Sequence, residues 1–181
     1  MEVDVIAVEK HLRQTRARID ELRAPAAPGV YACFLLDGSS LKPFAAGSDG
    51  LVYVGVTADL AEREFEQHFN SNRTGFSTLR RSLGAIVKER LNLTAVPRSP
   101  GASESNMRCY RFTEQGEQRL TEWMRRTIEV GVCGIGLAPD LEKMLIARMR
   151  PLLNLKGWPN PDRKEIKRLR KLCADEARSK R

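Results

Sequence analysis

Two short runs of β-type sequence each carry a tyrosine and a glycine, and their phenol groups are the first candidates for chemistry. The runs are Gly29-Val30-Tyr31 and Tyr53-Val54-Gly55, whose tyrosines lie twenty-two positions apart. Side chains alternate between the two faces of a strand, so if the runs pair as neighbouring strands both phenols can project into one site. A phenol has a pKa of about 10, and it acts as a base only where a nearby cation or metal lowers that value.

Two charged residues further along the chain could complete a site for phosphodiester hydrolysis. This reaction needs an activated water, a group that balances charge on the phosphate, and help for the departing oxygen. Arg63 follows Tyr53 by ten positions, and its planar guanidinium suits phosphate oxygens. Glu142 shares a predicted helical stripe with Leu145 and Met149, where a carboxylate without a cation would be costly. The alternative is that Glu142 only complements the dipole of the first helical turn.

The elements that must position these residues are strands and helices in mixed order. This order predicts an α/β (α+β) fold with a small, mostly antiparallel three-stranded central sheet flanked by helices. The tyrosine runs are two of the strands, and the Gly- and Ser-rich segment 37–50 between them is predicted to be a long hairpin loop. Further helices are predicted at 5–23, from about 57 to 69, and at 77–91, 113–126, 140–151 and 162–178, with strands at 107–112 and 127–133.

The residue set resembles the GIY-YIG nuclease family, whose two name-giving motifs are written here as Gly29-Val30-Tyr31 and Tyr53-Val54-Gly55. The resemblance covers residues 28–155. It implies that Tyr31 is the general base, that Tyr53 orients water or phosphate, and that Arg63 stabilises the transition state. It also implies that Glu142 binds one divalent metal, Mg²⁺ or in its place Mn²⁺. Asn154, twelve positions after Glu142, is expected to position Glu142 or a phosphate, although a turn residue alone would also explain it.

His68 departs from the spacing found in this family. In many members a histidine or tyrosine lies four positions after the arginine, but here that position is Gln67 and His68 is the next residue. At about 100° per residue, five residues place His68 roughly 140° from Arg63 around a regular helix. A local π-bulge would return His68 to the site. We favour that reading over the one in which His68 lies outside the site.

Composition and charge point to a polyanionic partner, for which we expect DNA. The formal net charge is +8 at pH 7 and the pI is about 9.6, and the basic residues cluster in segments 70–98 and 161–181. Arg73, Arg80 and Arg81 in the first cluster are expected to contact the DNA backbone. No feature of the sequence indicates an oligomeric state or a particular DNA target.

Cysteine and apolar patterns exclude several other classes. The four cysteines are widely spaced and the chain has two histidines, which argues against a zinc site and a disulfide framework. No stretch approaches eighteen apolar residues, and the first ten residues do not follow the pattern of a signal peptide. We therefore expect no membrane partner and a cytoplasmic location.

We expect three parts in the chain. Residues 1–27 form a helix and a Pro-rich segment, 28–155 the GIY-YIG-like nuclease domain, and 156–181 a basic helix that packs on the same domain. The predicted function is a Mg²⁺-dependent DNA endonuclease. The alternative is a non-catalytic or weakly active nucleic-acid-binding module of the same fold. Val56 and Phe76 favour this alternative. Val56 stands where members often carry a lysine, and Phe76 stands where some homing-type members carry a histidine.

Overall fold

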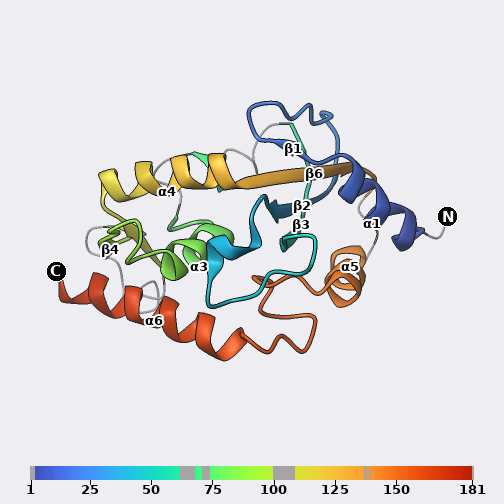
Figure 1. Cartoon of the computed structure of the whole chain (residues 1–181). Helices are drawn as coiled ribbons and strands as arrows, with labels where there is room; N and C mark the ends of the chain where they lie inside the picture. The colour runs from blue at the N-terminus through green and yellow to red at the C-terminus, as the bar shows by residue number, and fades with distance from the viewer. Residues whose placement is uncertain are drawn as a thin grey trace. The chain divides into compact units, whose positions relative to one another are not determined.

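The computed structural model describes residues 3–61, 68–70, 74–99, 109–136, 138 and 140–180. The chain divides into two compact units, both drawn in Figure 1. Unit 1 contains Met1–Phe65 and Arg125–Pro161, and unit 2 contains Glu66–Met124 and Asp162–Arg181. Among the described residues, no helix is both long and apolar enough to cross a membrane.

Unit 1 is built on an antiparallel sheet whose four described strands have the order β1-β6-β2-β3 (Figure 1). The strands are β1 (Ala17–Arg18), β2 (Gly29–Leu35), β3 (Leu51–Thr57) and β6 (Ile128–Gly134), and the 3-10 helix η1 (Gly38–Leu41) lies between β2 and β3. The three long strands are rich in β-branched and aromatic residues, which fit a pleated, buried surface. The predicted antiparallel α+β fold is confirmed, and the two tyrosine runs are neighbouring strands.

The sheet has one strand more than predicted, because the first helix is shorter than predicted. Helix α1 (Val5–Gln14) begins after Asp4, whose carboxylate accepts hydrogen bonds from the first turn. It ends at Thr15, whose hydroxyl lies 3.0 Å from the carbonyl oxygen of Val132 in β6. The chain then pairs with β6 as β1 instead of continuing as a helix. The predicted helix over 5–23 is therefore wrong beyond residue 14.

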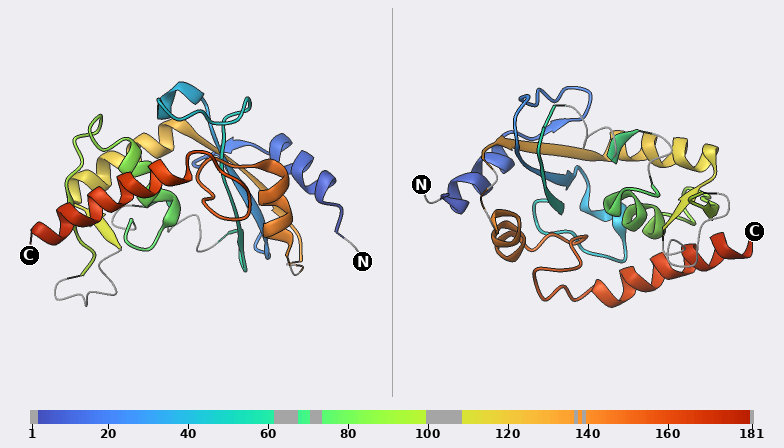
Figure 2. Two further views of the ribbon diagram at one scale, coloured as in Figure 1. Left: turned by 90° about the horizontal axis from the view of Figure 1, so that it is seen from below. Right: turned by 180° about the vertical axis from the view of Figure 1, so that it is seen from behind.

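One face of this sheet is covered by α1 and by α5 (Leu141–Met149), which lie side by side in both views of Figure 2. The approach is close enough to require Gly131 in β6, because a Cβ there would overlap the carbonyl oxygen of Leu12 in α1. The buried core between the helices and the sheet consists of Val8, Leu12, Val30, Ala32, Phe34, Leu51, Val54, Leu141, Leu145, Ile146 and Met149.

Unit 2 packs helices around a small second sheet. Helix α6 (Arg163–Ser179) lies against α3 (Thr78–Ile86) and against β4 (Ala95–Pro97) and β5 (Tyr110–Phe112). The boundary between the units falls near the end of α4 (Glu114–Thr127), which continues into β6. Strand β4 was not predicted. The strand expected at 107–112 is described only over Tyr110–Phe112, and residues 107 and 108 lie outside the described residues.

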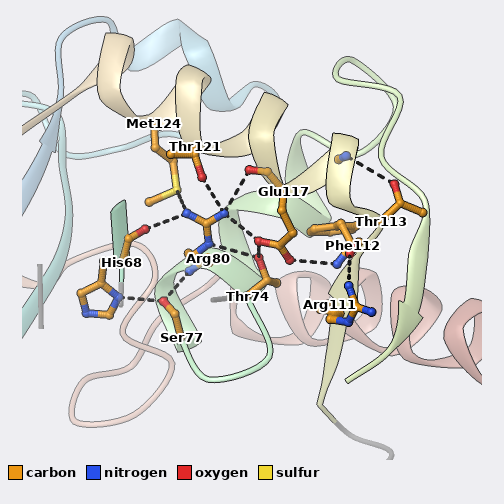
Figure 3. A network of polar contacts seen from close by, with 11 residues as sticks. His68, Thr74, Ser77, Arg80, Arg111, Phe112, Thr113, Glu117, Thr121 and Met124 are labelled. Atoms are coloured by element: carbon orange, nitrogen blue, oxygen red, sulfur yellow. Dashed lines mark hydrogen bonds and ion pairs between the residues drawn. The ribbon is translucent and has the colours of Figure 1, made fainter. Parts of the chain in front are cut away.

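A buried arginine lies at the centre of a network of polar contacts in unit 2 (Figure 3). The side chains of Arg80 and Glu117 have no exposed surface, and their closest nitrogen and oxygen atoms are 2.8 Å apart. The same guanidinium donates to Thr74 Oγ1 at 3.1 Å, to the carbonyl oxygen of His68 at 2.9 Å and to Thr121 Oγ1 at 3.0 Å. Burial lowers the pKa of Arg80, and the Glu117 carboxylate opposes that effect.

The carboxylate of Glu117 is equally well bonded. Its Oε2 also accepts from the Thr74 hydroxyl at 2.8 Å, and its Oε1 accepts from the backbone N–H of Phe112 at 2.9 Å. A buried ion pair is tolerated when both partners are hydrogen-bonded, because the desolvation cost is then offset. This network links α3, α4 and β5, so we infer that it sets how these elements pack.

We expect Glu117→Gln to lower the free energy of unfolding by about 3 to 5 kcal/mol, because it leaves the Arg80 charge buried without its counterion. The measurement is urea unfolding of the purified protein. Arg80→Met should cost a similar amount, and the double variant should cost less than the sum of the two.

The control is Glu165→Gln, which breaks an exposed ion pair with Arg168 in α6 and should change unfolding little. Strictly additive costs for the Arg80 and Glu117 variants would contradict the coupling described for the buried pair.

Candidate active site

The register of β2 and β3 brings the two phenols together. Tyr31 pairs with Gly55, and Cys33 pairs with Tyr53. The two tyrosines are therefore diagonal neighbours on one face of the sheet, where aromatic rings can reach each other. Their ring centroids are 6.2 Å apart, with 33° between the ring planes. This is the face opposite to the one that α1 and α5 cover, since Val30 and Val54 point into that core.

Gly55 is the glycine that this arrangement requires. A Cβ at Gly55 would lie 2.5 Å from Oη and 2.6 Å from Cζ of Tyr31. The Tyr31 phenol thus lies across the neighbouring strand in the space that a side chain would otherwise occupy. Tyr31 is only 2% exposed. The tyrosine of the first motif and the glycine of the second are complementary in shape, which gives the repeated tyrosine and glycine pattern a physical cause.

Asn154 holds the strand that carries the second motif. Its side chain is buried. Its Oδ1 accepts from the N–H of Val54, and its Nδ2 donates to the carbonyl oxygen of Val54, both at 2.9 Å. Strand β3 lies at the edge of the sheet. Between Tyr53 and Gly55, the Asn154 amide makes the backbone hydrogen bonds that a neighbouring strand would otherwise make. The Asn154 amide therefore holds β3 through Val54, and its expected role beside Glu142 or a phosphate stays a prediction.

The turn around Asn154 is itself fixed by two residues that sequence reasoning missed. The indole N–H of Trp158 lies 3.0 Å from the carbonyl oxygens of both Pro151 and Asn154. The Asn160 amide donates to the carbonyl oxygen of Leu152 at 2.7 Å. Trp158 and Asn160 stand in a Pro-rich segment without periodicity, so no sequence pattern indicates this role.

Glu142 lies in the first turn of α5 and is half-buried. The apolar stripe of this helix consists of buried residues such as Leu141, Leu145 and Met149. Glu142 therefore lies at the edge of the stripe, not inside it as expected. Among the described residues, no three His, Cys, Asp or Glu side chains form a metal-binding group. A half-exposed single carboxylate still fits Mg²⁺, which keeps several waters and needs only one or two carboxylates beside substrate phosphates.

Arg63 and Arg73 lie outside the described residues, as does Gln67. The predicted roles of the two arginines therefore stay predictions. The same holds for the π-bulge, which falls on the same part of the chain.

His68 is buried in unit 2 and holds the start of α3. Its Nδ1 lies 2.7 Å from the hydroxyl of Ser77, and that hydroxyl accepts from the N–H of Arg80 at 3.0 Å (Figure 3). The Ser77 hydroxyl can then donate to Nδ1, which fits a neutral ring with its proton on Nε2. Burial and the nearby Arg80 charge lower the pKa of His68 to about 4. The ring is thus neutral at pH 7.

Arg80 and Arg81 do not have the exposed positions expected of DNA contacts. Arg80 is completely buried in the network with Glu117. Arg81 is 9% exposed, and its guanidinium donates to the carbonyl oxygen of Gly75 and the hydroxyl of Thr78. The expectation rested on a solvated face of the helix, but residues 79–85 of α3 are all buried. The burial of Arg80 is a correction to that expectation, because a side chain with no exposed surface does not reach a phosphate.

Comparison with known proteins identifies the family of the chain. A family model described as the GIY-YIG catalytic domain matches residues 36–172, well over half of the chain. The matched stretch contains Tyr53, Arg63, Glu142 and Asn154, and it begins after Tyr31. No curated protein and no solved structure matched.

The buried His68 predicts a loss of stability in mild acid. Its pKa is about 4 in the folded protein against an ordinary value of 6.5. Between these values the unfolded chain binds more protons, so stability rises with pH from about 4 to 6.5 and then levels off. The difference corresponds to about 3 kcal/mol. His68→Gln should remove this part of the pH dependence in urea unfolding, whereas His11→Gln at the exposed second histidine should keep it.

Asn154→Ala should lower the free energy of unfolding by about 3 kcal/mol, since it leaves the N–H and carbonyl of Val54 without their partner. Urea unfolding measures the change, and Gln118→Ala, which removes an exposed amide from α4, is the matched control. A loss no larger than that of the control would show that the Asn154 amide does not hold β3.

Proposed function

Because this chain belongs to the GIY-YIG family, we propose that it is a metal-dependent endonuclease that hydrolyses phosphodiester bonds in DNA. The observation that carries the proposal is the tyrosine pair. Two phenol rings with centroids 6.2 Å apart lie on the adjacent strands β2 and β3, and Gly55, which has no side chain, leaves room for the ring of Tyr31. A nuclease-type catalytic domain supplies the reaction class, and the pair supplies oxygen donors that can share one phosphate.

In this proposal Tyr31 accepts a proton from the attacking water, and Tyr53 orients that water or the phosphate. The base is the deprotonated phenolate, which forms near neutral pH only where positive charge lowers the pKa of the phenol. We assign that charge to Arg63, whose guanidinium would also bind the transition state. We leave His68 out of the chemistry and assign it to holding α3 through Ser77, because the ring is buried and bonded there.

Glu142 is the proposed ligand of the divalent cation, Mg²⁺ or Mn²⁺. When bound, such a cation stabilises negative charge on the phosphate and on the departing oxygen. Glu142 stands in the first turn of α5, which packs against β3, the strand of Tyr53. The tyrosines and the body of α5 occupy opposite faces of that strand. We therefore place the proposed site at the edge of the sheet, around β3.

A second candidate function is a nucleic-acid-binding module of the same fold with little or no cleavage. The near-complete burial of Tyr31 favours it, because a general base must reach the attacking water. The net charge of +8 fits both candidates. The two candidate functions differ in whether the protein cleaves the sugar-phosphate backbone of DNA.

We expect the wild-type protein to nick supercoiled plasmid in the presence of Mg²⁺. Glu142→Gln should reduce the rate by about 100-fold or more, because loss of metal stabilisation removes several kcal/mol from the transition state. Glu89→Gln, the same change at an exposed position, should leave the rate unchanged. Gel electrophoresis of the plasmid over time gives the rates.

Absence of nicking by the wild type on duplex, branched and single-stranded DNA, with either metal ion, would favour the binding module. Full activity of Glu142→Gln would instead support the endonuclease proposal and show that Glu142 is not the metal ligand.

A further inference from the structure

The net charge of the chain resides entirely in unit 2. Unit 2 contains eighteen Lys and Arg against ten Asp and Glu, a net charge of +8. Unit 1 contains thirteen of each and is neutral. The unit that carries the tyrosines and Glu142 therefore has no net attraction for a polyanion, whereas the other unit attracts one strongly.

Part of this charge lines a groove on α6. The groove has a volume of about 420 Å³ and is lined, in the described part of the chain, by Lys167, Arg170, Lys171, Ala174 and Arg178. Their spacing of three, four and seven positions places them on one side of the helix. From Lys167 to Arg178 the helix rises about 17 Å, which is about the length of five base pairs of duplex DNA.

The groove is part of a fixed surface. Ile166, Cys173 and Ala177 of α6 are buried in the core of unit 2, where the helix packs against α3, β4 and β5. Lys167, Lys171 and Arg178 are exposed, and Arg170 is half-buried. The cations of the groove are thus presented by a helix that the core holds in place, which lowers the entropy lost on binding.

Two of the four groove cations have no carboxylate partner among the described residues. Asp175 pairs with Lys171 at 2.8 Å and also with Arg178. Among the described residues, no carboxylate lies within 4 Å of Lys167 or Arg170. One acid against four cations leaves the groove strongly positive.

Arg170 is the most confined of these cations. Burial lowers its pKa, and so does the like charge of Arg81 in α3. A phosphate oxygen in the groove would supply a counterion for the Arg170 guanidinium. Arg and Lys together are the usual contacts to the phosphates of nucleic acids.

We propose that the groove on α6 binds the sugar-phosphate backbone of duplex DNA. Unit 2 then holds the substrate on which the proposed site in unit 1 acts. This inference rests on the proposed function for its choice of DNA as the partner. It assigns the DNA contact to Lys167, Arg170, Lys171 and Arg178 and not to Arg80, whose charge is neutralised inside the unit.

The test is binding of a fluorescently labelled 25-base-pair duplex to the full-length protein in EDTA, followed by anisotropy at several salt concentrations. Lys167→Gln/Lys171→Gln removes two exposed groove cations. Each lost phosphate contact should raise Kd about eight-fold at 0.1 M salt, and the salt slope should fall by about 2 for the pair. The matched control is Lys164→Gln/Arg168→Gln, which removes the same charge from exposed positions of α6 that do not line the groove. It should leave the salt slope close to that of the wild type.

If the two double variants raised Kd and lowered the salt slope equally, the proposal for the groove would be wrong, since binding would then follow overall charge alone. Displacement of the duplex by polyglutamate at equal charge concentration would also overturn it, in favour of an acidic protein partner. Because EDTA prevents metal-dependent cleavage, this experiment is separate from nicking. If binding depends on the groove but the protein does not nick DNA, only the endonuclease proposal is wrong. If the protein nicks DNA but the two double variants weaken binding equally, only the groove proposal is wrong.

Discussion

The contact between the Tyr31 phenol and Gly55 across β2 and β3 is the constraint on which the candidate site depends. If β3 shifted by one residue against β2, Tyr53 would move to the face that α1 and α5 cover, away from Tyr31. Any side chain at Gly55 would collide with the phenol. The register of the two strands and the placement of the two phenols therefore depend on the same close fit between Tyr31 and Gly55.

Positive charge has two opposite uses in unit 2. The charge of the Arg80 guanidinium is neutralised inside the unit, where Glu117 and hydroxyl oxygens offset the cost of desolvation. The cations of the α6 groove remain at the surface with one acid among them. Counting lysines and arginines along the chain does not separate these cases, because an ion pair between residues 37 positions apart decides which arginine is neutralised.

Periodic features could be predicted from the sequence. The alternation in β2 and β3 identified the paired tyrosines, and the capping residue Ser77 marked the start of α3. Features that depend on distant contacts could not be predicted. Thr15 ends α1 because its hydroxyl bonds Val132, 117 positions away. The burial of Arg80 likewise depends on Glu117, since an arginine on an amphipathic helix has the same local pattern whether water or a carboxylate faces it.

The segment that begins at Glu142 and ends at Asn154 joins both parts of the proposed site, since it contains most of helix α5 and contacts the tyrosine strand β3. The resemblance placed Asn154 beside the chemistry, and the structure uses its amide to cover the exposed edge of β3 at Val54, 100 positions away. Glu142 begins α5, and Asn154 follows its end. The helix is thus tied to β3 by core packing along its length and by the amide beyond its C-terminus. The strand that carries Tyr53 and the helix that carries the proposed metal ligand are therefore held by the same stretch of backbone.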